Sequence, residues 1–239
     1  MSPPLVLVPG LLCDERLFAP QLPALLARTS VQIAETRLDP SLAAMASRLL
    51  AEAPPRFALA GLSMGGYVCF EVMRRAPERV IKLALLATQA RADTAEAAQR
   101  RRELMALAER GEFEGVAPRL LPLFVHPDHL DRLAPLVTAM AAAVGKDAFL
   151  HQQQAIMARP DSSALLPEIA CPTLVLCGRQ DQLTPVGLHE EMAAAIPEAT
   201  LVVLPRCGHL VTLERPESVT AQLLAWLEAP AAECGRGGR

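Results

Sequence analysis

Short apolar runs alternate along the first third of the chain with segments whose apolar residues recur at the spacing of an amphipathic helix. The runs that predict strands are residues 5–8, 31–38, 57–60 and 80–87. Helical spacing occurs through Phe18, Leu22 and Leu25, over residues 42–53, and from Ser63 to about residue 75. Strands that alternate with helices in this way form a mostly parallel sheet flanked by helices, so the pattern predicts the α/β class.

The alternation stops after Thr88 and resumes near residue 173. Residues 92–158 have helical spacing with breaks at Gly and Pro, which predicts an inserted helical cap of roughly four helices. The remaining predicted elements are strands at 173–177 and 200–204 and helices at 186–195 and 216–227. We therefore expect an α/β core (1–90 and 166–230), a helical cap (91–165) and a disordered tail (231–239).

The composition argues against several classes of protein. Of the 239 residues 21% are charged, and the net charge of −3 gives no indication of binding to nucleic acid or to an anionic membrane surface. No apolar run approaches the ~20 residues that a membrane span needs. The prolines near the N-terminus, and the lack of a basic stretch, predict a strand there rather than a targeting segment. Six cysteines form no CxxC pair, so we expect reduced, buried thiols and a cytoplasmic location.

Ser63 is at the centre of the sequence Gly61-Leu62-Ser63-Met64-Gly65-Gly66, between a predicted strand and a predicted helix. A serine on such a sharp turn has a strained backbone, and the residues two before and two after it must be small. The turn would expose the hydroxyl at a helix N-terminus, which favours developing negative charge. The same residues also fit an ordinary glycine-rich turn in which Ser63 only caps the helix.

Two further candidates follow predicted strands in the second half of the chain. Asp181 comes shortly after the strand at 173–177, and His209 comes after the strand at 200–204. Asp181 could instead form a turn, and His209 could be a surface residue of a loop. However, ligands of open α/β sheets bind at the carboxyl ends of strands, and the order Ser63, Asp181, His209 is one known order of a catalytic triad. Ser63 would be the nucleophile, His209 the base, and Asp181 the residue that orients the imidazole.

With these motifs the chain resembles the α/β-hydrolase superfamily over about residues 4–228, with a helical cap after the fourth strand. The resemblance implies an oxyanion hole made by the backbone N–H groups of Leu11 and Met64. Many relatives have His-Gly before the first of these donors, where this chain has Pro9-Gly10. Because the donor is a backbone group, the change of side chain should leave the hole intact.

The same resemblance implies a substrate pocket roofed by the cap. We expect apolar side chains to line it, and the candidates are Leu12, Phe124, Phe149, Met157, Leu183 and Leu210. The cap's own small core is the alternative place for some of them. Without an inward-facing basic cluster, such a pocket favours a small, mainly apolar acyl group.

Other polar residues have simpler explanations. His126 and His129 have only Asp128 and Asp131 as acidic neighbours, no cysteine cluster follows, and Pro127 breaks the helix between them, so we expect surface residues and no metal. His151 and His189 fall in predicted helices and are expected at the surface as well. The basic run 100–102 lies between acidic residues, which favours a solvated helix face over the alternative, anion binding.

Together these features favour a serine hydrolase, most directly a carboxylic-ester hydrolase that acts through an acyl-enzyme. We expect a small-molecule ester as its partner, no cofactor, and a monomer or homodimer. One alternative is the same triad acting on a lactone, an enol-lactone or a carbon–carbon bond, because the hexapeptide at 61–66 also resembles that of enol-lactone hydrolases. A second alternative is a ligand-binding protein without catalysis. Such proteins usually lose a triad member, and none is lost here.

Overall fold

A sheet of six parallel strands forms the centre of the computed structural model, which describes residues 2–230. The strands are β1 (Leu5–Val8), β2 (Val31–Ile33), β3 (Phe57–Leu62), β4 (Val80–Leu86), β5 (Thr173–Gly178) and β6 (Ala199–Leu204). Their order in the sheet is β2-β1-β3-β4-β5-β6, and every neighbouring pair is parallel. The prediction of an α/β fold with a parallel sheet is therefore confirmed.

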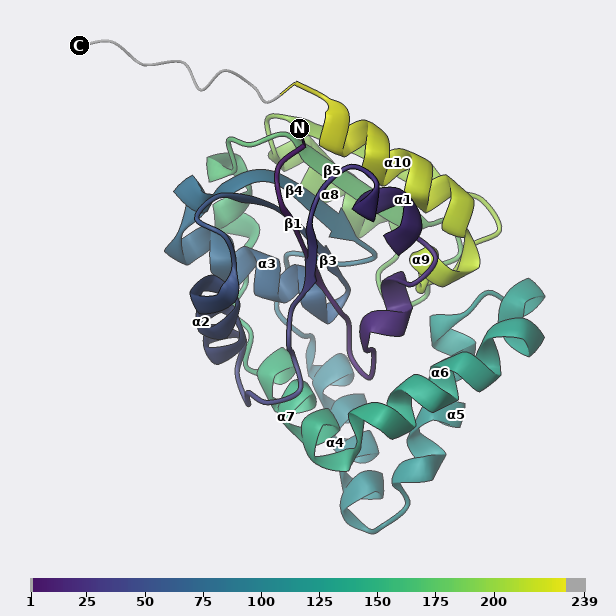
Figure 1. Ribbon diagram of the computed structural model, residues 1–239. Helices are drawn as coiled ribbons and strands as arrows, with labels where there is room; N and C mark the ends of the chain where they lie inside the picture. The colour runs from purple at the N-terminus through teal and green to yellow at the C-terminus, as the bar shows by residue number, and fades with distance from the viewer. Residues whose placement is uncertain (1, 231–239) are drawn as a thin grey trace.

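Helices cover the two faces of the sheet (Figure 1). The helices that flank the sheet are α1 (Leu22–Leu26), α2 (Leu42–Glu52), α3 (Met64–Arg75), α8 (Val186–Ala195), α9 (Val211–Glu214) and α10 (Pro216–Glu228). In Figure 1, α2 and α3 lie on one side of the strands, and α1 and α10 lie together on the other. Local sequence starts two of these helices: the Ser41 hydroxyl accepts the N–H of Ala44 at α2, and Pro216 occupies the first turn of α10.

Four α-helices lie between β4 and β5 in the sequence and gather at one end of the sheet (Figure 1). They are α4 (Ala95–Glu109), α5 (Val116–Phe124), α6 (Leu130–Val144) and α7 (Lys146–Met157). The segment from α4 to α7 is called the cap below. Within residues 2–230 no single helix is long and apolar enough to cross a membrane. The segments Pro127–Val144 and Lys146–Met157 reach that length and apolar content only when they are taken together, and the chain bends by 92° between them.

Two elements are shorter than the sequence pattern predicts. The strand expected at 31–38 ends at Ile33, where its pairing with β1 ends, and Glu35 and Arg37 beyond it form an ion pair with each other. The helix expected through Phe18 and Leu25 is split into a 3-10 helix, Glu15–Phe18, and α1. Pro20 lies between them and lacks the N–H that a continuous helix would need.

The five cysteines of the described part of the chain are free thiols, as expected. Four are buried and Cys171 is partly exposed. Burial raises the pKa of Cys13 and of Cys177 to about 12, so both remain protonated at neutral pH. Cys234 and the tail expected to be disordered, residues 231–239, lie outside the described residues.

A buried lysine on β4 joins the sheet to the end of α10. Lys82 is 2% exposed, which is rare for a lysine. Its ammonium donates hydrogen bonds to the carbonyl oxygens of Trp226 at 2.8 Å and Leu227 at 2.7 Å, and to that of Ala229. The last carbonyl groups of a helix have no N–H donors within the helix, because no further turn follows them. The helix dipole also favours a cation at this end.

Replacing Lys82 with Met should therefore destabilise the protein although the side-chain length is kept. The variant leaves three carbonyls without their donor, and we expect the free energy of unfolding to fall by about 2–4 kcal/mol. Urea denaturation followed by circular dichroism would measure the loss. Lys146→Met, at an exposed lysine at the start of α7, is the matched control. Equal stability of the two variants would contradict the role given to Lys82.

Candidate functional site

Ser63 lies on the sharp turn between β3 and α3, in a backbone conformation that non-glycine residues rarely adopt. Its φ is 56° and its ψ is −115°. Two hydrogen bonds hold the turn: the Ser63 N–H donates to the Leu86 carbonyl at 2.9 Å, and the Thr88 hydroxyl donates to the Ser63 carbonyl at 2.8 Å. The strain expected from the sequence is therefore present, and the end of β4 supports it.

The glycines on either side of Ser63 are needed for close packing. A Cβ atom at Gly65 would overlap the backbone carbonyl of Val8 on β1, and one at Gly61 would overlap the carbonyl of Gly65. These contacts bring the first turn of α3 directly against the sheet. The requirement for small residues two before and two after Ser63 is thus steric.

Asp181 and His209, which are 28 residues apart, meet beyond the ends of β5 and β6. His209 Nδ1 lies 2.8 Å from Asp181 Oδ2, and both side chains are buried. The carboxylate also accepts the N–H groups of Leu183 and Thr184 and the Thr184 hydroxyl. Burial acts to raise the pKa of Asp181, but the nearby His209 and these hydrogen bonds outweigh it and hold the pKa below its usual range.

The pairing fixes the tautomer of His209. An ionised carboxylate can only accept hydrogen bonds, so the imidazole carries its proton on Nδ1. Nε2 then has a free lone pair and can take up a proton. The Phe124 ring stacks beside this imidazole, with ring centroids 5.8 Å apart, and shields it from solvent.

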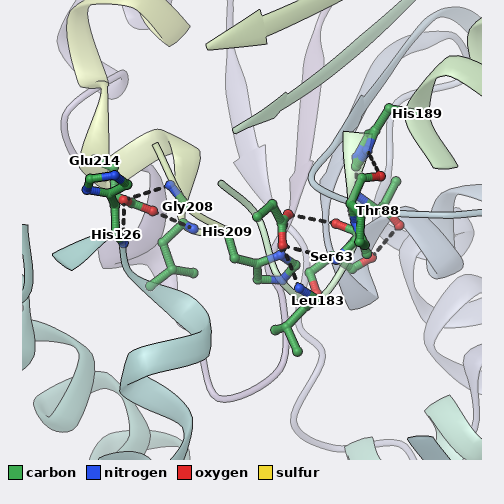
Figure 2. A network of polar contacts seen from close by, with 12 residues as sticks. Ser63, Thr88, His126, Leu183, His189, Gly208, His209 and Glu214 are labelled. Carbon is green, nitrogen blue, oxygen red and sulfur yellow. Dashed lines mark hydrogen bonds and ion pairs between the residues drawn. The ribbon is translucent and has the colours of Figure 1, made fainter. Parts of the chain in front are cut away.

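Ser63 and His209 both line a cavity of about 410 Å³. In Figure 2 the His209 side chain lies next to Ser63. Leu11, Phe124 and Leu183 are also in the wall, so two of the apolar residues expected there, Phe124 and Leu183, line the cavity.

The other four apolar residues expected in the wall lie elsewhere. Leu12 is buried in the core of the protein, at a positive φ of 59°. Phe149 packs on Phe113 inside the cap, with ring centroids 5.7 Å apart. Leu210 is buried within the loop of His209, and Met157 is the partly exposed last residue of α7. Periodicity identifies an apolar face of a helix, but it does not say whether that face meets a cavity or a core.

The two backbone N–H groups expected to form an oxyanion hole are placed near Ser63. Leu11 lines the cavity, and Met64 is the first residue of α3. Neither N–H donates to an acceptor within the part of the chain that the structure describes. The first N–H groups of a helix have no partner inside the helix, and they can donate to an anion.

The loop of His209 is held by Glu214, a residue that the sequence reasoning missed. The buried Glu214 carboxylate accepts the N–H groups of Gly208 at 2.9 Å and Leu210 at 3.1 Å, on both sides of His209. It also accepts the N–H of His126 from the cap at 2.8 Å (Figure 2). In addition, the carbonyl of Phe124 at the end of α5 accepts the N–H groups of His209 and Leu210. The cap and the histidine loop are thus joined by backbone hydrogen bonds.

His189 is buried, so the prediction that it lies at the surface is wrong. Its Nε2 accepts the N–H of Thr88 at 3.1 Å, and its Nδ1 lies 3.3 Å from the Pro185 carbonyl (Figure 2). The ring must therefore be neutral, with its proton on Nδ1. Burial lowers the pKa of His189 to about 4. Since Thr88 supports Ser63, α8 contributes to the position of the serine turn.

The remaining polar candidates are mostly at the surface. His126 Nδ1 accepts the N–H of Asp128, and the partly exposed His129 contacts the Arg206 carbonyl. His151 is partly exposed on α7. Among residues 2–230 no group of three or more His, Cys, Asp or Glu side chains is arranged to hold a metal ion.

The basic run 100–102 is divided between the surface and the cavity. Arg102 is exposed and hydrogen bonds to Gln99 on its own helix, as a solvated face would. Arg100 is exposed as well, although it is in the cavity wall. Arg101 is partly buried and pairs with Asp93, so the prediction was wrong for Arg101. Alternation of charges along a helix does not reveal a neighbouring cavity.

Comparison with known proteins places this architecture among hydrolases. The sequence model described as "Alpha/beta hydrolase family" matches residues 5–223. The pimeloyl-acyl-carrier-protein methyl ester esterase of Chromobacterium violaceum is 30% identical over 195 residues, which are 79% of this chain and 76% of that protein.

Two solved structures are similar over most of their length. A thermophilic esterase from Thermogutta terrifontis, with malate bound, has a TM-score of 0.87 at 30% identity, covering 95% of this chain and 90% of that one. The enol-lactonase of Burkholderia xenovorans LB400 has a TM-score of 0.86 at 25% identity, covering 95% and 92%.

The buried, neutral His189 should make stability depend on pH. Between pH 6.5 and about 4 the unfolded chain takes up a proton at this histidine while the folded protein does not. Stability is therefore lost as the pH falls through this window, by up to about 3 kcal/mol from this group. In His189→Gln, whose amide oxygen can still accept the Thr88 N–H, this part of the pH dependence should disappear.

Urea denaturation at several pH values from 4 to 7.5 would measure the effect. His151→Gln, which removes a partly exposed histidine, should retain the wild-type dependence. If the curves of wild type and His189→Gln run parallel, His189 does not titrate as described.

Glu214→Gln should loosen the loop that carries His209. The amide replaces one accepting oxygen with a donor that faces a backbone N–H, so we expect a loss of about 1–3 kcal/mol in the free energy of unfolding. Hydrogen exchange of the segment around Gly208 and Leu210 should become faster. Glu217→Gln, at an exposed position on α10, is the control and should leave exchange there unchanged. Unchanged exchange in Glu214→Gln would show that the carboxylate does not hold this loop.

Proposed function

Because this chain belongs to the alpha/beta hydrolase family, we propose that it is a serine hydrolase that cleaves carboxylic esters at Ser63. The observation that carries the proposal is the buried Asp181–His209 pair, whose imidazole lines the same cavity as Ser63. The serine occupies a strained turn at the start of a helix, where its hydroxyl can meet a carbonyl group in the cavity. The esterases among the similar proteins support the choice of an ester bond.

The proposed reaction has two stages that use the same imidazole. In the first, Ser63 Oγ attacks the carbonyl carbon of the ester while His209 Nε2 takes the hydroxyl proton. The tetrahedral intermediate then expels the alcohol, which receives that proton from His209, and an acyl-enzyme remains. In the second stage water attacks the acyl carbon, His209 takes its proton, and the proton returns to Ser63 as the acid leaves. Asp181 stabilises the imidazolium in both stages.

The negative charge that develops on the carbonyl oxygen needs donors that are already in place. We assign this role to the N–H groups of Leu11 and Met64, which donate to no other acceptor within the described residues. Each such donor is worth about 10²–10³ in turnover in enzymes of this type. Because the donors are backbone groups, the Pro9-Gly10 sequence before Leu11 does not alter them.

A lactone is the second candidate substrate, and one observation favours it. The enol-lactonase of Burkholderia xenovorans has nearly the same fold as this chain. A lactone is a cyclic ester, so the same two stages would open it, with the alcohol remaining on the product. Comparing rates on open-chain esters and on lactones of the same acyl length would distinguish the two.

Ser63→Ala should abolish ester hydrolysis while the fold is retained. We expect kcat for 4-nitrophenyl butyrate to fall by about 10⁴–10⁶, as for loss of the nucleophile in other triads. Circular dichroism would verify folding. Ser47→Ala, at an exposed serine on α2, should keep wild-type activity.

Labelling with a fluorophosphonate gives an independent measurement, because the reagent reacts with an activated serine. The wild type should be labelled at Ser63 and the Ser63→Ala variant should not. An unchanged rate in Ser63→Ala would exclude the proposed nucleophile. A wild type that neither turns over esters nor reacts with the probe would favour a ligand-binding protein without catalysis.

A further inference from the structure

The cavity beside Ser63 contains more basic side chains than the sequence suggests. Four arginines are in its wall, namely Arg100, Arg101, Arg110 and Arg119, and only two acids, Asp93 and Glu103. Glu103 is exposed and accepts a hydrogen bond from Gln99. The expectation of a pocket without an inward basic cluster is therefore wrong. Three of the arginines are exposed, while Arg101 reaches into the protein with a side chain that is 21% exposed.

Two guanidinium groups share a single carboxylate next to this cavity. Asp93 Oδ2 accepts from Arg101 at 2.7 Å, and Asp93 Oδ1 accepts from Arg159 at 2.5 Å. The Arg159 side chain is almost fully buried and lies over the ring of Tyr67, which is itself in the cavity wall. Arg101, Arg159 and Asp93 together therefore carry a net charge of about +1. An uncompensated charge away from water is costly, and an anion in the cavity would lower that cost.

Gln153 has a buried donor that no group among the described residues satisfies. Its Oε1 accepts from Arg101 at 2.9 Å, and this contact fixes the orientation of the amide because a guanidinium can only donate. The Nε2 group then faces away from Arg101 and has no hydrogen-bond partner among the described residues. Gln153 is fully buried and is part of the cavity wall. A buried N–H donor of this kind is normally paired, so it indicates a missing acceptor.

We propose that Arg101 and Gln153 bind a free carboxylate of the substrate, so that the preferred ester carries a negative charge away from the bond that is cleaved. This inference rests on the proposed function, because it names the class of ester. A carboxylate accepts from the Gln153 amide and balances the charge shared by Arg101 and Arg159. Arg101 is held in place by Asp93 and Gln153, so little side-chain entropy is lost when the anion binds.

The rest of the cavity fits the body of such a molecule. Its wall includes the apolar side chains Leu104, Leu107, Leu120, Leu123 and Ile156, which suit a hydrocarbon chain. The volume of about 410 Å³ is in the usual range for small-molecule sites. The exposed Arg100 and Arg119 add positive potential around the cavity, and this attracts anions from solution, whereas the charge of Arg110 is paired with Glu112.

The experiment compares two esters that differ only in a terminal charge. Mono(4-nitrophenyl) adipate ends in a carboxylate, and 4-nitrophenyl hexanoate has a methyl group at that position. We expect the wild type to have a kcat/KM for the adipate ester at least about tenfold higher than for the hexanoate ester, the size of one charge-assisted hydrogen bond. In Gln153→Glu the donor becomes an anion, and the ratio of the two kcat/KM values should fall by about a hundredfold.

Two more variants keep the test decisive. Gln153→Leu removes the donor without adding charge, and we expect the ratio to fall by about tenfold. Arg102→Gln removes an exposed arginine of α4 that points away from the cavity, and the ratio should stay at its wild-type value. A wild-type ratio near one, unchanged in both Gln153 variants, would overturn the carboxylate site. An equal fall in Arg102→Gln would also overturn it, because the preference would then reflect general surface charge.

Calorimetric titration with adipate separates this inference from the proposed function. If neither ester is turned over, yet adipate binds the wild type and not Gln153→Glu, the ester hydrolase is excluded and the carboxylate site is retained. If adipate does not bind and neither ester is hydrolysed, both proposals fail. Hexanoate, which lacks the second carboxylate, should bind at least about tenfold more weakly than adipate.

Discussion

The backbone of Ser63 has a conformation that the surrounding structure must hold in place. A non-glycine residue at a φ of 56° costs on the order of 1–3 kcal/mol. The hydrogen bond from Thr88 and the close contact of Gly65 with β1 supply the restraint. Thr88 is fixed in turn by His189 on α8, the helix that follows the Asp181 loop. The serine turn and the carboxylate loop are therefore parts of one packed unit, so the geometry of the site depends on the core beneath it.

Much of this arrangement could be predicted because it depends on residues that are neighbours in the sequence. Continuous apolar runs ended by Pro or Gly located the strands, and parallel strands bring their carboxyl ends to one edge of a sheet. Residues that follow strands, such as Ser63, Asp181 and His209, could thus be expected near one another. The structure brings Asp181 and His209 into contact and places His209 with Ser63 in one cavity wall.

What could not be predicted depends on contacts between distant segments. His189 falls in a helix without a clear apolar face, and only its packing against the loop of Thr88 makes it a buried acceptor. Arg101 belongs to a charged stretch that is typical of a solvated surface, yet α4 turns it toward Asp93 and Gln153. No sequence pattern identified Glu214 as the residue that holds the His209 loop, since a single acid after a loop has many possible roles. In each case the deciding factor is the rotation of a helix relative to a neighbour far away in sequence.

The hydrogen bonds from His209 and Leu210 to the carbonyl of Phe124 have a mechanical consequence. They couple the end of α5 to the loop of His209, so this part of the cap cannot swing outward as a free lid without displacing the His209 imidazole. Any widening of the cavity that keeps the imidazole in register has to come from α4 and α7, the helices that carry Arg101 and Gln153. Movement of α4 and α7 would thus change the part of the cavity beside Arg101 and Gln153, while the position of His209 relative to α5 stays constant.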